Sequence, residues 1–324
     1  MKRIFITGIA GFIGFHLALA LKKRGDAVFG CDNFNAYYDP ALKKERAQIL
    51  SDAGIPWIDC DITHRHTIEA ELDRHQITHL AHLAAQAGVR YSLTHPETYV
   101  HSNLNGFVQI LEALRSRPST KLIYASSSSV YGLNTKIPFS ENDPVEKPAS
   151  FYGATKRSNE LIAQSYHQVH GLSCTGLRFF TVYGPWGRPD MAYYSFTKAI
   201  LEDQPISVFG EGKLQRDFTY IDDIIAGTIA AIDLGAAAEI FNLGNNTPLS
   251  VLELIGTLET HLNKKARLVF QPTPPGDVPI TYADITKSQS VLNFAPQTSL
   301  YDGLKRFTDW YRMTKAAAPA VAIK

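Results

Sequence analysis

The feature that most constrains the fold is a glycine-rich turn between an apolar run and a helical pattern. It reads Gly8-Ile9-Ala10-Gly11-Phe12-Ile13-Gly14, after a predicted strand at Arg3–Thr7 and at the start of a predicted helix at Phe12–Arg24. Without side chains the backbone can approach a pyrophosphate, whose charge then meets the helix amides and the positive end of the helix dipole. The GxxGxxG spacing therefore predicts a dinucleotide-binding turn, although glycines alone also form turns that bind nothing.

Short β-rich runs alternate with helical patterns up to about residue 181. Strands are predicted at residues 3–7, 27–31, 79–83, 121–125, 173–178 and 239–243, and helices at 12–24, 98–115 and 152–170. This predicts the α/β class, a Rossmann-type doubly wound parallel sheet with a smaller C-terminal substrate-binding lobe. We assign 1–180, completed by about 220–247, to the dinucleotide-binding domain. The second lobe takes 181–219 and 248–315, and 316–324 is expected to be a flexible tail.

Charge and cysteine pattern exclude several classes of protein. With 32 Lys and Arg against 31 Asp and Glu, the net charge is +1, so no overall field attracts nucleic acid or an anionic membrane. No apolar run reaches the roughly 18 residues that span a bilayer, and the N-terminal run ends without a signal-peptide cleavage site. Cys31, Cys60 and Cys174 show no metal-ligand spacing and are expected to be reduced core thiols of a cytoplasmic protein.

Asp32 follows the second predicted strand, where a carboxylate can accept hydrogen bonds from a ribose 2′-hydroxyl. A 2′-phosphate would be repelled there, and the neighbouring Asn33 supplies no positive charge to offset this, so the position favours NAD over NADP. The alternative is an ordinary aspartate in a surface turn. Asp61 and Ile62 lie at the end of an expected third strand of the sheet, between the strands at 27–31 and 79–83, where they are expected to contact adenine.

Tyr152 and Lys156 are four residues apart and therefore share one helix face. A phenol with a pKa of about 10 is no base at neutral pH, but a neighbouring cation stabilises its phenolate. A packing tyrosine beside a solvated lysine is the alternative. Upstream, the serines of segment 125–132 follow a predicted strand, so their hydroxyls emerge where open α/β sheets bind ligands, unless the segment is a linker.

Together these motifs resemble the extended short-chain dehydrogenase/reductase family, over residues 1–312. The resemblance implies that Tyr152 is the catalytic base, that Lys156 activates it and binds the nicotinamide ribose, and that Ser127 and Ser129 bind the reacting sugar. Segment 82–86 resembles the family's cofactor wall, and Asn103 its helix asparagine. The NAD site so implied comprises Gly8, Gly11, Phe12, Ile13, Gly14, Asp32, Asn33, Asp61, Ile62, Leu83, Ala84, Ala85, Gln86, Asn103, Tyr152 and Lys156.

The second lobe is similar to that of nucleotide-sugar epimerases. Arg216, in the segment 215–223, matches an arginine that contacts the substrate diphosphate, although an ion pair with Asp217 is an alternative. Phe209 resembles the uracil contact. Asp277 matches a late loop that closes over the nucleotide, but no arginine stands nearby, which puts its phosphate role in doubt.

Segment 178–192, with Tyr37-Tyr38-Asp39-Pro40 and the following Leu42-Lys43, closely resembles UDP-glucuronate 4-epimerases. Thr181 and Arg188 offer a hydroxyl and a cation suited to a sugar carboxylate, whereas a solvent-exposed loop arginine is the alternative. The resemblance implies 4-epimerisation of UDP-glucuronate to UDP-galacturonate through a transient 4-keto intermediate with tightly bound NAD. The implied substrate residues are Ser127, Ser128, Ser129, Tyr152, Thr181, Arg188, Phe209, Arg216 and Asp277.

Three alternatives remain open at this point: a UDP-glucose 4-epimerase, a UDP-glucuronate decarboxylase, and a non-catalytic NAD-sensing binding module. The first would not need Arg188, and the second would let the 4-keto acid lose carbon dioxide. Intact Tyr152 and Lys156 argue against the third. The resemblance also implies a homodimer formed through helices 98–115 and 152–170, with a UDP-sugar as the small-molecule partner.

Overall fold

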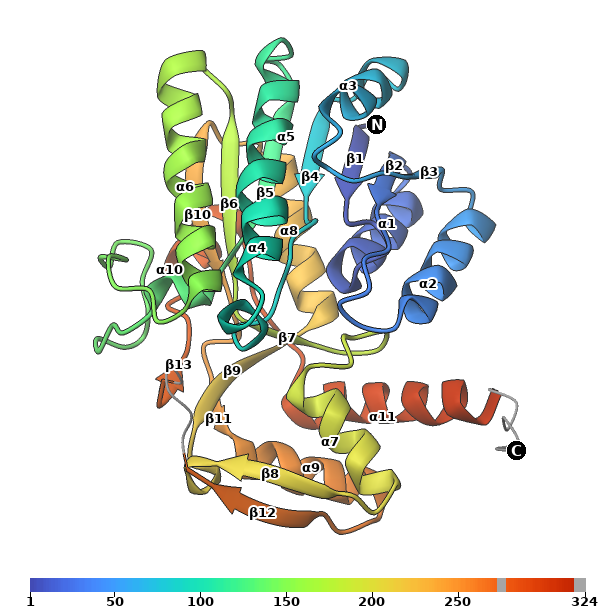
Figure 1. The fold of residues 1–324 in the computed structure, drawn as a ribbon, viewed down its shortest axis with the longest axis vertical. Helices are drawn as coiled ribbons and strands as arrows, with labels where there is room; N and C mark the ends of the chain where they lie inside the picture. Colours follow the sequence, from blue (N-terminus) through green and yellow to red (C-terminus); the bar gives the residue numbers. More distant parts are fainter. Residues whose placement is uncertain (273–277, 318–324) are drawn as a thin grey trace.

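The computed structural model describes residues 1–272 and 278–317, of which 315–317 by backbone only. The larger lobe holds a seven-stranded parallel sheet in the order β10-β6-β5-β4-β1-β2-β3 (Figure 1). The chain moves outward from β1 in both directions, so the predicted α/β doubly wound sheet is confirmed. The strands are β1 (Arg3–Thr7), β2 (Ala27–Asp32), β3 (Trp57–Asp59), β4 (His79–His82), β5 (Lys121–Ser127), β6 (Cys174–Phe179) and β10 (Ala238–Leu243).

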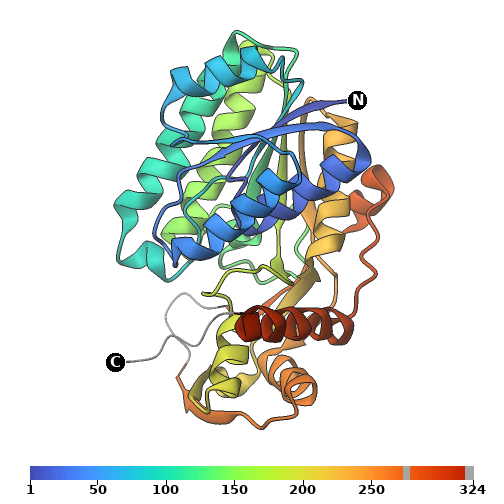
Figure 2. The same cartoon turned by 90° about the vertical axis from the view of Figure 1, so that its right-hand side faces the viewer.

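Helices cover both faces of this sheet (Figure 2). Ile4 and Ile6 of β1 join the apolar cluster that contains the buried residues of α1 and α8, whereas Phe5 joins the cluster of α3 and α5. Side chains alternate in this way because successive residues of a strand point to opposite faces. The helices of this lobe are α1 (Phe12–Arg24), α2 (Pro40–Asp52), α3 (Arg65–Arg74), α4 (Pro96–Tyr99), α5 (Gly106–Arg115), α6 (Phe151–His170), α8 (Ile221–Leu234) and α10 (Thr286–Leu292), with short turns η1 (Tyr91–Leu93) and η3 (Ser128–Tyr131).

The smaller lobe lies beneath the carboxyl ends of the large sheet in the view of Figure 1. Its central strand β9 pairs with β7, β11 and β13, and β8 pairs with β12 in a separate ribbon. None of the helices in the described residues is both long and apolar enough to cross a membrane. The elements are β7 (Thr181–Tyr183), β8 (Pro205–Phe209), β9 (Gln215–Tyr220), β11 (Pro248–Ser250), β12 (Arg267–Gln271), β13 (Ile280–Thr281), α7 (Ala192–Leu201), α9 (Val251–Leu262), α11 (Leu300–Ala317) and η4 (Gly210–Gly212).

The predicted helix 98–115 is helical throughout but is not one regular helix. It divides into α4, a π-helical turn η2 (Val100–Asn105), and α5. Within the turn the carbonyl of Asn103 accepts a hydrogen bond of 2.6 Å from the Asn159 side chain on α6. A side chain that inserts into the backbone ladder in this way is a known cause of such an irregularity, and the sequence pattern of one segment could not show it.

Candidate active site

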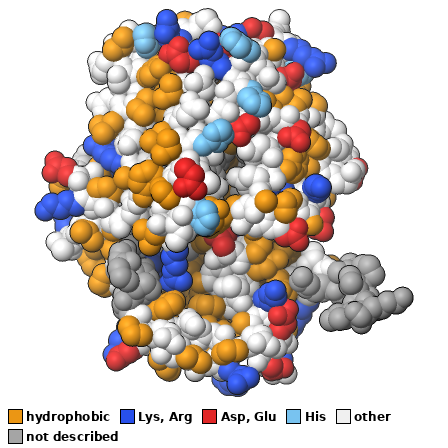
Figure 3. Space-filling model, viewed as in Figure 1, with side chains coloured by type: hydrophobic (Ala, Val, Ile, Leu, Met, Phe, Trp, Pro, Cys, Tyr) orange, Lys and Arg blue, Asp and Glu red, His pale blue; other side chains and the backbone are white. Residues whose placement is uncertain are grey.

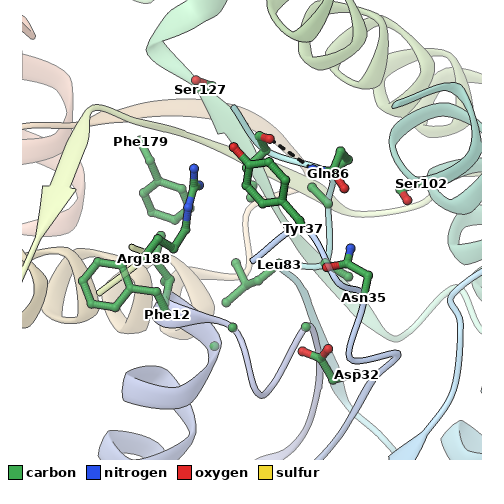
Figure 4. A pocket seen from close by; sticks show the side chains of 18 of the residues that line it. Phe12, Asp32, Asn35, Tyr37, Leu83, Gln86, Ser102, Ser127, Phe179 and Arg188 are labelled. Carbon is green, nitrogen blue, oxygen red and sulfur yellow. Dashed lines mark hydrogen bonds between the residues drawn. The ribbon is translucent and has the colours of Figure 1, made fainter. Parts of the chain in front are cut away.

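A cleft opens at the carboxyl ends of β1, β2, β4, β5 and β6 and reaches toward the smaller lobe (Figure 4). It encloses about 1320 Å³, part of which is open to solvent. Asp32 lies near one end of the view and Ser127 near the other, with Arg188 and Tyr37 between them. The predicted residues that line it are Gly8, Gly11, Phe12, Ile13, Gly14, Asp32, Asn33, Ile62, Leu83, Ala84, Ala85, Gln86, Ser127, Tyr152, Lys156 and Arg188.

The glycine-rich turn needs its glycines for two physical reasons. Gly8 has a φ of +70°, and a Cβ there would meet the backbone of Ala84 at 2.8 Å. A Cβ on Gly14 would lie 2.2 Å from the Gly8 carbonyl oxygen. Gly11 caps α1 with no side chain bonded to the first helical amides, so these amides remain available to an anion. The turn thus has the shape and polarity that a dinucleotide pyrophosphate requires.

Asp32 is buried at the end of β2, and its carboxylate accepts hydrogen bonds from the backbone amides of Ala10 at 3.2 Å and Phe34 at 2.9 Å. Lys43 of α2 places its ammonium 3.4 Å from the same carboxylate and donates to Asn35 at 2.9 Å. Asn33 supplies no positive charge beside Asp32, but Lys43 does. No sequence pattern indicated this contact, because Lys43 reaches Asp32 from the following helix α2.

Asp61 lies just after β3 but is not among the lining residues, where its neighbours Cys60 and Ile62 are found. Burial would raise the pKa of Asp61, but hydrogen bonds from the Thr63 backbone and hydroxyl and from Asn33 lower it to about 2. The carboxylate is therefore charged and engaged in holding this loop.

The segment after β4 forms one wall of the cleft through Leu83, Ala84, Ala85 and Gln86. Asn103 does not line the cleft. Its side chain accepts a hydrogen bond from the Gln86 amide at 2.8 Å and donates to the Gln86 carbonyl at 3.0 Å. Asn103 therefore supports the wall from behind.

Tyr152 and Lys156 project from the first turns of α6 into the cleft, as their spacing predicts. Burial raises the pKa of Tyr152, while the Ser127 hydroxyl and the Arg188 guanidinium act to lower it. Burial lowers the pKa of Lys156 to about 8, against the opposing effect of Glu160. The Lys156 ammonium donates to the Ala125 carbonyl of β5 at 2.9 Å. A half-buried phenol and a buried ammonium thus line the same cleft.

The serines after β5 divide into two groups. Ser126 and Ser127 line the cleft, whereas Ser128 and Ser129 begin the short turn η3 and are not among the lining residues. The Ser127 hydroxyl accepts from the Ser129 amide at 3.1 Å and lies 3.2 Å from the Ser129 hydroxyl. Ser129 therefore contacts Ser127 from behind the wall.

Arg188 extends into the cleft in the neighbourhood of Phe179 (Figure 4). Its guanidinium forms two hydrogen bonds with the Asp190 carboxylate, 3.0 Å from Nε and 2.6 Å from Nη2. The Tyr37 hydroxyl donates to the same carboxylate at 3.0 Å. With 24% of its side chain exposed, Arg188 is not the solvated loop arginine of the alternative interpretation. Thr181 is not a lining residue, although its neighbours Phe180 and Val182 are.

The residues predicted to bind uridine and diphosphate lie outside this cleft. Phe209 ends β8, and the Arg90 guanidinium lies 4.7 Å from the centre of its ring. Arg216 of β9 donates to the Gln215 carbonyl at 2.8 Å. The Asp217 carboxylate is fully buried and accepts hydrogen bonds from the backbone amides of Asn245, Asn246 and Ala283 and from the Thr219 hydroxyl. Asp277 lies outside the described residues.

Several lining residues were not assigned a role from the sequence, namely Asn35, Tyr37, Tyr38, Lys43, Ser102, Ser126 and Phe179. Asn35, Ser126 and Phe179 sit at or just after the ends of β2, β5 and β6. The rule that ligands bind at the carboxyl ends of parallel strands was therefore enough to find these three. Ser102 lies in the π-helical turn, where the regular helix predicted for that segment gave no reason to single it out.

The chain matches the "NAD dependent epimerase/dehydratase family" over residues 4–244. It is 50% identical to UDP-glucuronate 4-epimerase 4 of Arabidopsis thaliana, covering 95% of this chain and 75% of that protein. The crystal structure of UDP-glucuronic acid 4-epimerase from Bacillus cereus, in complex with UDP-glucuronic acid and NAD, is 38% identical with a TM-score of 0.91 and covers 97% of this chain and all of that one. UDP-glucose 4-epimerase of Thermotoga maritima is 30% identical with a TM-score of 0.87, covering 97% of this chain and all of that one.

Proposed function

The chain belongs to the NAD dependent epimerase/dehydratase family, and from that membership we propose that it is an isomerase that converts UDP-glucuronate to UDP-galacturonate by 4-epimerisation with NAD. The observation that carries this choice within the family is Arg188, a cation that enters the cleft also lined by Tyr152 and Lys156. A carboxylate on the sugar is the substrate feature that such a cation recognises.

The cleft fits NAD at the turn and at the end of β2. The spaces at Gly8 and Gly14 accept no side chain, and the first amides of α1 suit a pyrophosphate. Asp32 would hold the adenosine ribose, beside Lys43. When bound, NAD supplies reversible hydride transfer at carbon 4 of the sugar, so the isomerisation leaves the cofactor unchanged.

Tyr152 takes the proton of the 4-hydroxyl and returns it after the sugar has turned its other face. Its phenol is protonated at neutral pH while burial dominates its pKa, so it needs positive charge nearby to act as a base. Lys156, one helical turn away, contributes that charge. The Ser127 hydroxyl, which acts to lower the Tyr152 pKa, orients the phenol and the sugar hydroxyl.

We assign residues 1–180 and 220–247 to NAD binding, and 181–219 and 248–315 to the UDP-sugar, except that α10, within the last range, packs against α8 and β10 of the larger lobe. Phe209 and Arg216 would then meet the uracil and the diphosphate once the nucleotide joins the two lobes. Thr181, next to the lining residue Val182, would reach the sugar carboxylate from β7. These roles rest on the family resemblance and on the position of the smaller lobe below the cleft (Figure 1).

A specific observation keeps the UDP-glucose 4-epimerase as second candidate. Asp190 neutralises much of the Arg188 charge, and this reduces the advantage that the cleft offers a uronate over a neutral sugar. We would incubate the purified protein with UDP-glucuronate and, separately, with UDP-glucose, and identify products by NMR. The proposal predicts UDP-galacturonate from the first and little UDP-galactose from the second. A Tyr152→Phe control must be inactive, and conversion of UDP-glucose alone would replace the proposal by the second candidate.

We propose that the protein is a cytoplasmic homodimer that joins through α5 and α6. The segment that leads into α5 and the outer surface of α6 carry exposed apolar side chains, among them Val100, Leu161 and Val169, and Figure 3 shows hydrophobic side chains gathered over this part of the larger lobe. The three buried free cysteines suit a reducing compartment. Leu161→Glu should halve the mass measured by light scattering, and an unchanged mass would argue against this interface.

A further inference from the structure

Arg46 is a fully buried arginine without a carboxylate partner. It lies on α2 with 0% of its surface exposed, and no ion pair joins it to an acidic side chain in the described ranges. Its Nε atom has no hydrogen-bond partner there either. Burying an unpaired charge is costly, and an apolar side chain of similar volume would fill this site more cheaply. Its hydrogen bonds therefore need an explanation beyond packing.

Those hydrogen bonds join segments that are far apart in the sequence. Nη1 donates to the Ala10 carbonyl, inside the glycine-rich turn, and to the Tyr38 hydroxyl, each at 2.9 Å. Nη2 donates to the carbonyls of Trp186 at 2.5 Å and Gly187 at 3.3 Å. One guanidinium thus connects the cofactor turn to the backbone immediately before Arg188.

A second side chain of the larger lobe holds the same backbone. His16 of α1 lies with Nε2 2.9 Å from the Pro185 carbonyl. Burial lowers the pKa of His16 to about 4, so the ring is neutral at pH 7 and can donate through Nε2. Three successive carbonyls, those of Pro185, Trp186 and Gly187, are therefore bound by side chains of α1 and α2.

The backbone held in this way has an unusual conformation at Trp186. Trp186 has a φ of +59°, in the left-handed region that side chains with a Cβ rarely adopt. Its ring packs between those of Phe15 and Trp310, whose centroids lie 5.6 and 5.2 Å from its own, which restrains the side chain. The Trp186 carbonyl accepts the hydrogen bond of 2.5 Å from Arg46. The next residue after this segment is Arg188, whose side chain enters the cleft.

We propose that Arg46 is a positioning residue, whose guanidinium ties the glycine-rich turn to the Trp186–Gly187 backbone and thereby fixes where Arg188 meets the sugar. The inference rests on the proposed function, because it treats Arg188 as the group that recognises a uronate. It predicts that Arg46 controls the preference for a charged over a neutral sugar, although Arg46 lies behind the cleft and does not line it.

Arg46→Lys tests the idea, because lysine keeps the charge but cannot bind four acceptors with the fixed fork of a guanidinium. Lys44→Met is the matched control, since it removes an exposed cation from the same helix. For each protein we would measure the NAD content, the dissociation constants of UDP-glucuronate and UDP-glucose, and the products formed from UDP-glucuronate. Melting temperature reports the fold separately.

We expect Arg46→Lys to retain NAD and to lose about 10- to 100-fold of its preference for UDP-glucuronate over UDP-glucose, the effect of misplacing one hydrogen bond to a charged group. A 4-keto uronate is a β-keto acid, so if its carboxylate is no longer held in place it can be lost as carbon dioxide, a proton taking its position, and a decarboxylated pentose product should appear as well. Lys44→Met should behave like the parent. Arg46→Lys with the parent's preference and product, whatever its melting temperature, would overturn the inference and leave Arg46 a role in folding only.

If Arg46→Lys does not fold, Arg46→Met replaces it, because an apolar side chain of similar volume needs no hydrogen bonds at this buried site and removes those to the Trp186 and Gly187 carbonyls. We expect the same loss of preference, and an unchanged preference in this variant would overturn the inference. Failure of the proposed function gives a different result, since the parent itself would then not convert UDP-glucuronate.

Discussion

Removing the Arg188 guanidinium should weaken the binding of a uronate much more than that of a neutral sugar. The guanidinium has five N–H donors, and the hydrogen bonds to Asp190 use two of them. A sugar carboxylate can therefore bind to the remaining donors without displacing Asp190. Arg188→Ala deletes these donors while leaving the folded backbone of the segment intact.

The expected loss of UDP-glucuronate affinity in Arg188→Ala follows from the strength of a hydrogen bond to a charged group and from the exposure of Arg188. A hydrogen bond to a charged group contributes about 1.5–3 kcal/mol, which corresponds to roughly 10- to 150-fold in the dissociation constant. The Arg188 side chain is 24% exposed, so solvent screening favours the lower half of this range. Arg188→Ala also leaves the Asp190 carboxylate unpaired, and this charge would repel the incoming uronate. For UDP-glucose we expect a change of less than about threefold.

Calorimetric titration of the NAD-loaded protein with both UDP-sugars measures this selectivity, and two further variants separate the two causes. Asp190→Asn should tighten UDP-glucuronate binding, because it leaves the Arg188 charge without its neutralising partner. The double variant Arg188→Ala/Asp190→Asn should recover part of the affinity that Arg188→Ala loses. Equal losses for both sugars in Arg188→Ala would refute the carboxylate role and return the choice to the neutral-sugar epimerase.

Three further predictions concern the other polar groups of the cleft. Tyr152→Phe should retain its fold and its NAD while turnover falls by about 100-fold or more, since only the proton acceptor is lost; a single-turnover assay checks this. Asp32→Ala should lose most of its discrimination against NADP, because Lys43 then faces the 2′-phosphate unopposed; equal discrimination in titrations of parent and variant would contradict it. The folded-state pKa of Lys156, about 8, lies below the ordinary 10.5, so the unfolded chain binds more protons between these values and stability rises with pH there. In urea unfolding, the free energy of unfolding of the cofactor-free parent, measured relative to that of Lys156→Met, should rise by up to about 1.4 kcal/mol per pH unit between pH 8 and 10.

Local patterns singled out residues of the glycine-rich turn and of α6 that the structure places along the cleft, because each signal lies within a few residues. The turn around Gly8 to Gly14 and the pair Tyr152 and Lys156 are of this kind. Their chemistry depends on one strand end or one helix face, which a single segment specifies. The same local signals gave the bounds of β1 and α1 without error.

Contacts between distant segments could not be predicted in the same way. Lys43 reaches Asp32 from the following helix, and Asn159 donates to the Asn103 carbonyl from another helix. No periodicity encodes such meetings, because they depend on how helices pack on the sheet. The Arg188 and Asp190 pair is different. Its members are two residues apart, but no sequence pattern indicated that they pair, because Arg188 was interpreted only as a partner for a substrate carboxylate.

The buried ion pair of Arg178 and Glu160 links the elements that carry Ser127, Tyr152 and Lys156. Arg178 of β6 binds both oxygens of the Glu160 carboxylate, at 2.8 and 2.9 Å, and the Ser126 hydroxyl donates to it at 2.6 Å. Strands β5 and β6 and helix α6 are thus fixed at one point beside the cleft. Lys156 stands one helical turn before Glu160, whose charge raises the Lys156 pKa against the larger effect of burial. The carboxylate that positions the strand end at Ser126 therefore also keeps the Lys156 cation available at neutral pH, a reason to retain an ion pair that packing alone would not favour.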